Sequence, residues 1–321
     1  LGIYNCSAPT ITNITPSQIV CSGVTLPISV TATGSGLGYQ WRKDGVNIVG
    51  ATASSLTLTG FSSTASGIYS VVITSLGGNL TSSGISLTLG CNNALDFDGV
   101  NDAISVGANT VLNNLATNQF TFEAWINIPN SASAQSIFRK TGDYNFFILN
   151  QKLYIEIWPN GIGNSTWRQY SGTQNITHNT WVHVAVSYSD NIAEFYINGT
   201  KETISSFSTG SIVNSENLGV GHSSIYLNYL QGKLDEARIW NRALSQEEIQ
   251  LNRFRNLTNT VSGLVLYYDF NQGLIGQNNS GFNTIADKSG NGNTGTLSNF
   301  SLDGSSSNYV NVSSTTISGA Y

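Results

Sequence analysis

Acidic residues and histidines decide whether this sequence could catalyse a reaction. A retaining glycosidase needs two carboxylates about 5–5.5 Å apart. On a strand, side chains alternate between faces, so such a pair would stand two or four positions apart. Glu156 and Glu194 each stand alone in their segments, and the adjacent Asp235 and Glu236 are expected on opposite faces. The three histidines are His178, His183 and His222. None of them has a serine or cysteine nucleophile motif nearby in the sequence. We therefore expect no enzymatic activity.

Aromatic residues near the middle of the chain are the best candidates for a ligand-binding site. Tyr154, Glu156 and Trp158 alternate with apolar residues, so they share one face of an expected strand. Trp167 and Tyr170 follow a Gly- and Asn-rich stretch and are expected on the neighbouring strand. Aromatic rings with an apolar body beside hydrogen-bonding groups suit a glycan. The alternative is that this face packs beneath a covering loop or another part of the chain.

Composition favours β-structure and excludes some partners. Charged residues make up 10% of the 321 residues, well below the roughly 25% of an ordinary domain. Ser, Thr, Asn and Gly supply the polarity instead, and their mixture with Val, Ile and Leu favours strands and turns. The net charge of −5 argues against nucleic acid, which requires a basic surface. No run of about 18 apolar residues occurs, so we expect no membrane span.

Residues 1–91 are expected to form one small β-sandwich. Short apolar–polar alternations recur with turn signals between them, which is typical of a sandwich. The expected strands are Leu26–Thr33, Gly38–Lys43, Ser55–Thr59, Gly67–Thr74 and Thr81–Leu89. Asp44 and Gly45 predict a tight hairpin turn, because both accept the positive φ that the turn requires.

Two motifs in this first part resemble those of immunoglobulin-like domains. Tyr39–Gly45 is similar to that family's third strand, with Trp41 as the buried core tryptophan. Ser66–Val71 is similar to its sixth strand, with Tyr69 as the tyrosine of the corner motif. Val71 stands where that family's second intersheet cysteine would be, so the resemblance implies an apolar core without that bridge.

The three cysteines all lie in or next to this first part. They are Cys6, Cys21 and Cys91. Cys21 and Cys91 bracket the strands of the expected sandwich and are predicted to form a disulfide, as oxidising compartments favour. Cys6 is then left over, with an undetermined pairing. The alternative is three free, buried thiols.

Residues 92–321 carry a different set of motifs, in a specific order. They are Leu95–Asp102, Phe120–Ile126, Trp181–Val186, Ala193–Gly199 and Gly232–Trp240. This order resembles the laminin-G-like jelly roll of the concanavalin A-like lectin and glucanase superfamily. Ser245 and Glu248 then predict the capping box of a short helix. A C-terminal extension begins at about residue 263, where an apolar segment can add a strand. The expected fold is all-β, an immunoglobulin-like sandwich followed by a concanavalin-type jelly roll.

The jelly-roll resemblance also implies a metal site. In that family an acidic residue of the closing strand often meets the opening strand's turn around calcium. By position these residues are Asp98, Asn101, Asp102 and Asp235. Calcium prefers such oxygen ligands, so a structural Ca²⁺ is predicted. The alternative is that the aspartates only stabilise a backbone turn.

The resemblance implies a non-catalytic, extracellular module of a larger bacterial cell-surface protein. The Glu-x-Asp-x-(x)-Glu run of the glucanase relatives is absent from this sequence. The jelly roll is expected to bind a glycan or surface polymer, with the immunoglobulin-like domain as a spacer between neighbouring modules. The alternative is a structural link in an adhesin or filament that acts through a protein partner, and a glycoside hydrolase is the least favoured interpretation.

Overall fold

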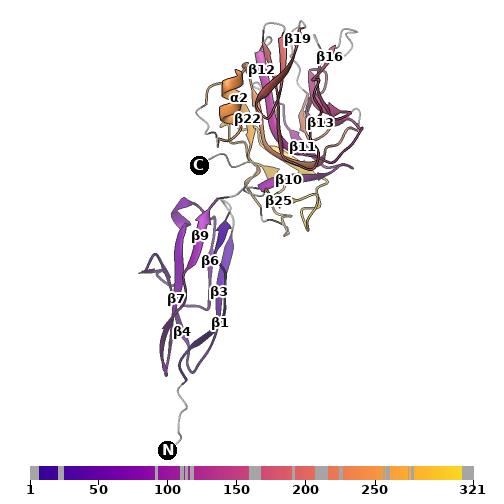
Figure 1. Ribbon diagram of the computed structural model, residues 1–321. Helices are drawn as coiled ribbons and strands as arrows, with labels where there is room; N and C mark the ends of the chain where they lie inside the picture. The colour runs from indigo at the N-terminus through magenta and orange to yellow at the C-terminus, as the bar shows by residue number, and fades with distance from the viewer. Residues whose placement is uncertain are drawn as a thin grey trace, which may run out of the picture. The chain divides into compact units, whose positions relative to one another are not determined.

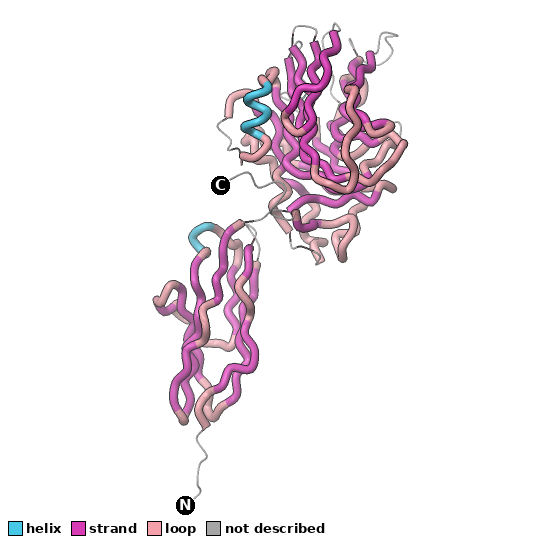
Figure 2. Tube along the Cα trace, in the orientation of Figure 1, coloured by secondary structure: helices cyan, strands magenta, loops and turns pink. Residues whose placement is uncertain are grey.

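The computed structural model divides into two compact β units (Figure 1). One consists of Leu1–Cys91 with Asn271–Gly273, and the other of Asn92–Phe270 with Leu274–Tyr321. The structure describes residues 7–20, 25–90, 93–108, 112, 115, 119–158, 168–189, 192–206, 216–223, 227–255, 257, 261–273, 275 and 278–312. Strands dominate both units (Figure 2), which confirms the predicted all-β class. Among these residues, no helix is long and apolar enough to cross a membrane.

The first unit is a sandwich of two sheets. Their strand orders are β1-β3-β6 and β2-β9-β7-β4-β5, with β8 paired to β7. The elements are β1 (Thr10–Ile14), β2 (Gln18–Val20), β3 (Leu26–Thr33), β4 (Gly38–Lys43), β5 (Val46–Asn47), β6 (Ser55–Leu58), the 3₁₀ turn η1 (Ser63–Ala65), β7 (Gly67–Ser75), β8 (Gly78–Thr81) and β9 (Ile85–Leu89). The single strand expected over Thr81–Leu89 is wrong. Residues 82–84 interrupt it, and the Ser82 hydroxyl accepts a hydrogen bond from the Val71 amide.

The core of the first unit forms around Trp41 and Tyr69, which are both buried. The Trp41 indole donates a hydrogen bond to the Ala53 carbonyl at 3.0 Å. The Tyr69 hydroxyl donates one to the Ala65 carbonyl at 2.7 Å. Each aromatic side chain therefore buries its apolar body while its polar atom is satisfied by backbone.

The predicted turn between β4 and β5 is confirmed. Asp44 and Gly45 have φ of 49° and 82°, the left-handed conformation in which glycine has no steric penalty. The three cysteines, and with them the predicted Cys21–Cys91 disulfide, lie outside the described residues. That pairing stays a prediction.

The second unit is a sandwich of two larger sheets, here named by central strands (Figure 1). The β12 sheet has the order β19-β18-β17-β12-β21-β10-β25, with β22 also on β21, and the β14 sheet has the order β16-β15-β14-β13-β20-β11-β24-β23. The elements are β10 (Asn93–Asp98), β11 (Ala103–Val106), β12 (Gln119–Asn127), β13 (Gln135–Lys140), β14 (Tyr144–Leu149), β15 (Lys152–Ile157), β16 (Arg168–Ser171), β17 (Val182–Ser189), β18 (Ile192–Ile197), β19 (Thr200–Ser206), β20 (Leu218–Val220), β21 (Gln231–Trp240), α2 (Gln246–Asn252), β22 (Leu264–Tyr268), β23 (Thr284–Ile285), β24 (Gly295–Ser298) and β25 (Tyr309–Asn311).

The main core lies between these two sheets. Aromatic and branched side chains from both inner faces fill it, including Phe122 of β12 and Phe146 of β14. Such interdigitation of two sheets stabilises a sandwich through apolar burial. Each sheet therefore has a second face directed away from the core.

Helix α2 covers part of the second face of the β12 sheet. Its Ile249 packs with Tyr196, Trp240 and Tyr267, outside the main core. The predicted capping box is confirmed, because the Ser245 hydroxyl accepts from the Glu248 amide and the Glu248 carboxylate accepts from the Ser245 amide.

The C-terminal extension completes the second unit. The expected apolar strand is β22, which pairs with β21. Beyond it, β24 pairs with β11 and β25 pairs with β10. The last strands of the described chain therefore lie beside the first strands of this unit.

Candidate functional site

Strand β15 separates apolar and polar side chains onto its two faces. Leu153, Ile155 and Ile157 are fully buried in the core between the sheets. Tyr154 and Glu156 alternate with them and are half-buried on the opposite face. Trp158 directly follows the strand and is also half-buried, and its amide donates to the Asp143 carbonyl. The second face of the β14 sheet therefore carries the predicted aromatic and acidic side chains.

Strand β16 is the expected neighbour of β15, but one of its predicted site residues faces the core. Tyr170 pairs with Ile155 and packs against the core between the sheets. It therefore lies on the face opposite Tyr154 and Glu156, and its assignment to the binding face is wrong. Trp167 lies outside the described residues. Gln169, which pairs with Glu156, takes the place on the binding face that was expected for Tyr170.

A row of polar side chains crosses four strands on this face. Arg139 of β13 pairs with Asn145 of β14, Asn145 with Glu156, and Glu156 with Gln169. The Asn145 amide donates to Glu156 Oε2 at 3.2 Å, and the Gln169 amide donates to Glu156 Oε1 at 2.9 Å. The Arg139 Nη1 lies 3.5 Å from Glu156 Oε2. The carboxylate is therefore the centre of the row.

Aromatic rings flank the polar row on both sides. Tyr154 stacks on Phe147 with ring centroids 5.2 Å apart. On the other side, the Arg139 guanidinium carbon lies 4.7 Å from the centroid of the Trp158 ring, within the range of cation–π attraction. Tyr154 and Trp158, which are both partly exposed, are thus each in contact with a buried neighbour.

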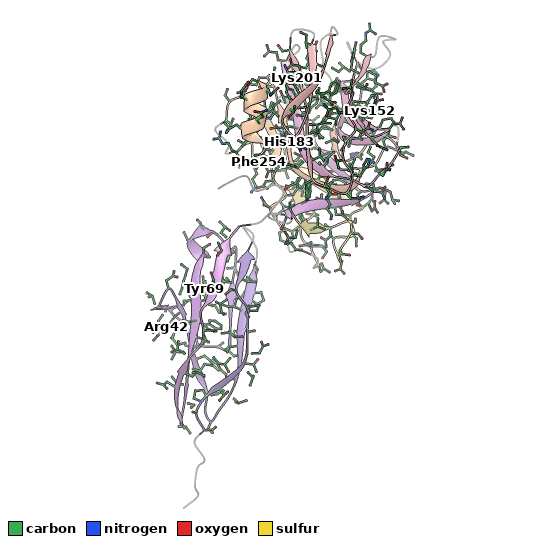
Figure 3. The ribbon with its side chains drawn as sticks, in the orientation of Figure 1. Arg42, Tyr69, Lys152, His183, Lys201 and Phe254 are labelled. Atoms are coloured by element: carbon green, nitrogen blue, oxygen red, sulfur yellow. The ribbon has the colours of Figure 1, made fainter. Side chains whose placement is uncertain are left out.

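Exposure is concentrated over β15 and β16. Arg139, Asn145 and Phe147 are 3% or less exposed. In contrast, Tyr154, Glu156 and Trp158 are half-buried and Gln169 is exposed. We call these last four residues the β15 strip; Lys152, labelled in Figure 3, is the first residue of the same strand.

The sequence pattern did not reveal the residues that support this strip. Arg139, Asn145 and Phe147 lie on β13 and β14, which are buried on both faces and show no alternation. A lone Arg or Asn within an apolar segment is the signal that could have indicated them, because buried polar groups need partners.

The residues predicted to bind calcium do not converge in one place. Asp98 Oδ1 accepts from the Val100 and Asn101 amides. Asp102 is buried and accepts from the Asp98 amide and the Ser307 hydroxyl. The Asp98 and Asp102 oxygens therefore accept hydrogen bonds within and beside their own turn, and calcium at this turn stays a prediction.

Asp235 lies away from that turn. Asp98 pairs with Gln231, and Leu95 pairs with Leu234. Asp235 is therefore four positions along β21 from the partner of Asp98, about 13 Å at the usual strand rise. The grouping of Asp235 with the turn residues is wrong. No group of three or more His, Cys, Asp or Glu side chains suited to a metal occurs within the described residues.

A bulge in β21 changes the expected orientation of Asp235 and Glu236. Glu236 has a φ of 50°, and the register between β12 and β21 shifts beside it. Leu234 and Ala237, which flank the pair, both face the core. Asp235 and Glu236 therefore point to the same face, away from the core, and the expectation of opposite faces is wrong.

These acids belong to a buried polar cluster beneath the α2 segment. Its members are Glu123, His183, Asp235, Glu236, Arg238 and Tyr267. Arg238 forms an ion pair with Glu236 and lies 3.5 Å from Glu123. It also donates to the backbone carbonyls of Asn252 and Arg255 at 2.8 and 2.9 Å. The cluster thus fastens the end of α2 and the following residues to the β12 sheet.

Burial sets the protonation of this cluster. It raises the pKa of Glu236 to about 7 and the pKa of Asp235 well above its usual value, with the Glu236 charge adding to the second shift. Burial alone would raise the pKa of Glu123, but His183 and Arg238 hold it below its usual value. Burial lowers the pKa of His183, which is labelled in Figure 3. Its ring lies beside that of Trp125. Burial therefore favours the protonated forms of Asp235 and Glu236, while His183 and Arg238 favour the ionised form of Glu123.

Neither the adjacent Asp235 and Glu236 nor Glu156 is arranged like the carboxylate pair of a glycosidase. Asp235 and Glu236 are covered by protein and 7% or less exposed. Glu156 accepts hydrogen bonds from two amides and faces Arg139. A carboxylate so engaged can orient neighbouring groups, but it has no second carboxylate among these contacts with which to share acid–base work.

Comparison with known proteins agrees with the β-sandwich of the second unit. Residues 98–250 match the family described as the concanavalin A-like lectin/glucanases superfamily, under the name Laminin_G_3. This match confirms the predicted jelly roll. No curated protein sequence matches the chain.

Solved structures are similar to this chain at low sequence identity. One is a candidate carbohydrate-binding protein from Bacteroides ovatus, 19% identical, with a TM-score of 0.52 and coverage of 88% of this chain and 93% of that one. A pentraxin from Limulus polyphemus is 16% identical, with a TM-score of 0.40 and coverage of 56% and 92%. The CBM40 of a Ruminococcus gnavus sialidase, bound to sialyllactose, is 12% identical, with a TM-score of 0.39 and coverage of 50% and 98%.

Proposed function

We propose that the second unit is a non-catalytic carbohydrate-binding module of an extracellular bacterial surface protein. The observation that carries the proposal is the β15 strip, where the partly exposed Tyr154 and Trp158 flank a hydrogen-bonded Glu156. Aromatic side chains stack on the apolar faces of sugar rings. Amide groups that are held in place form hydrogen bonds with the sugar hydroxyl groups. The lectin and glucanase family match and the Bacteroides ovatus protein support the same ligand class.

The absence of catalysis is part of the proposal. Glu156 is held by Asn145, Gln169 and Arg139, and the Asp235 and Glu236 carboxylates are buried away from solvent. A hydrolase would need an accessible carboxylate pair spanning a bound sugar. Release of reducing ends from a glycan bound by the purified chain would contradict this part.

A glycan array followed by calorimetry with the retained glycans tests the binding function. Tyr154→Ala and Trp158→Ala should each weaken binding by about tenfold or more, as loss of an aromatic anchor does. Tyr39→Ala, which changes a half-buried tyrosine of the first unit, is the matched control and should bind normally. If no glycan is retained and the chain instead self-associates or captures a protein, the structural-link function replaces this one.

The first unit is proposed to be an immunoglobulin-like spacer. Buried Trp41 and the Tyr69 hydrogen bond to Ala65 support that resemblance. A spacer takes no part in ligand recognition, so Val49→Ser at a 99% exposed position should leave glycan affinity unchanged. A loss of affinity in that variant would assign ligand contacts to the first unit.

A further inference from the structure

The two aromatic residues of the β15 strip are too far apart to contact one sugar ring. Tyr154 and Trp158 lie on the same face, four positions apart in an extended segment. At the usual rise of a strand, this corresponds to about 13 Å. That span is longer than one pyranose ring, so a ligand that reaches both aromatics must extend over several sugar units.

Each aromatic side chain is fixed by a different buried neighbour. Phe147, which is 3% exposed, stacks against Tyr154. Arg139, also 3% exposed, lies over Trp158. Because the supporting residues are held within the sheet, the two rings lose little freedom on binding, which favours affinity.

The middle of the strip presents amide groups and a compensated charge. Both oxygens of Glu156 accept hydrogen bonds, one from Asn145 and one from Gln169. Arg139 lies close enough to balance the carboxylate. The exposed Gln169 amide is therefore an accessible hydrogen-bonding group, while the whole chain has a net charge of −5, which disfavours anionic ligands.

We propose, on the basis of the glycan-binding function above, that the β15 strip binds an internal stretch of a linear, neutral glycan. Tyr154 and Trp158 stack on different sugar units, and Gln169 hydrogen-bonds hydroxyl groups between them. Glu156 is a positioning residue that orients Gln169 and compensates Arg139.

Calorimetry with chain-length series tests this proposal. The ligands are cello-, xylo-, manno-, malto- and chito-oligosaccharides of one to six units, with oligogalacturonides as the anionic comparison. For the series that binds, affinity should rise steeply over the first few units and then level off. It should exceed the affinity for oligogalacturonides and change little with added salt.

Variants of the strip locate the two contact points. Tyr154→Ala and Trp158→Ala should each lower the affinity for a hexasaccharide by about tenfold or more. The ring-preserving Tyr154→Phe should retain most of the affinity. Thermal melting of each variant establishes that the fold is intact.

The possible failures are distinct. If a monosaccharide binds as tightly as a hexasaccharide, or if oligogalacturonides are preferred, the extended neutral site is overturned while the glycan-binding function stands. If no member of any series binds and the array retains no glycan, both are overturned. If Tyr154→Ala affects the affinity and Trp158→Ala does not, the ligand contacts one point only and the two-point site is wrong.

Discussion

The Tyr267 hydroxyl donates a hydrogen bond of 2.7 Å to Glu236 Oε2 and so joins β22 to β21 beneath the α2 segment. Glu236 also forms an ion pair with Arg238, which holds the backbone after α2. This corner of the unit therefore depends on the protonation and charge balance of a few buried side chains.

The contribution of Glu236 to stability should fall as pH rises toward neutrality. Burial raises the pKa of Glu236 from 4.5 to about 7, so the folded chain binds this proton more tightly than the unfolded chain. The associated stability is fully present below about pH 4.5 and is lost as pH rises through about 7. The loss is roughly 3 kcal/mol, from about 1.36 kcal/mol for each pKa unit. Asp102, whose pKa burial raises to about 6, adds to the same trend.

Glu236→Gln separates this contribution from the others. The amide can still accept from Tyr267 but cannot ionise. The free energy of unfolding of the wild type, measured relative to this variant, should therefore fall between pH 5 and 8, because the opposing contribution of His183 is common to both proteins. Urea unfolding at each pH measures it, with the exposed Glu247→Gln of α2 as control. A difference in stability between the wild type and Glu236→Gln that stays constant over this range would contradict the assignment.

Removal of Arg238 should destabilise the second unit selectively. Arg238→Met leaves Glu123 buried without its nearby guanidinium, and such a loss typically costs about 3–5 kcal/mol. Calorimetric scanning should show a lowered transition for the second unit and an unchanged one for the first. Arg242→Met, which removes the more exposed pair with Glu248, should cost about 1 kcal/mol or less. Equal effects of the two variants would rule out a special role for Arg238.

The sequence alone was sufficient where a local rule determines the structure. The alternation of β15, the Ser245–Glu248 capping box and the Asp44–Gly45 turn each depend on neighbouring residues. The pattern therefore identified Tyr154, Glu156 and Trp158 as sharing one face.

Contacts that depend on strand register could not be predicted in the same way. A shift of one residue moves a side chain to the other face, and the pairing of β16 with β15 places Gln169 rather than Tyr170 beside Glu156. Strand β13, which supplies Arg139, is buried on both faces. Its sequence therefore lacks the apolar–polar alternation by which a strand is recognised. The bulge at Glu236 is likewise unexpected, since a positive φ is uncommon for this residue type.

Calcium at the turn of residues 98–102 stays a prediction, and the structure restricts which residues could take part. Calcium is expected to raise the melting temperature of the wild type but not that of Asp102→Asn, which loses a ligand charge. Asp235→Asn should respond to calcium like the wild type, because Asp235 lies about 13 Å along the strand. A melting temperature that is unchanged by both calcium and EDTA would show that the turn needs no metal.

Tyr154 and Tyr170 should differ in what their removal affects, although both were candidates for the binding face. Tyr170 packs against the core opposite Ile155, so Tyr170→Ala should lower the free energy of unfolding by about 2 kcal/mol, less than for a fully buried ring. Because the side chain faces away from the β15 strip, glycan affinity of the folded variant should stay close to that of the wild type. Tyr154→Ala should show the reverse, with weakened binding and a smaller stability change, since its ring lies on the face opposite the core-facing Ile155. Urea unfolding and calorimetric binding on the two variants together measure this, and a binding loss in Tyr170→Ala at unchanged stability would place the ligand on the opposite side of β16.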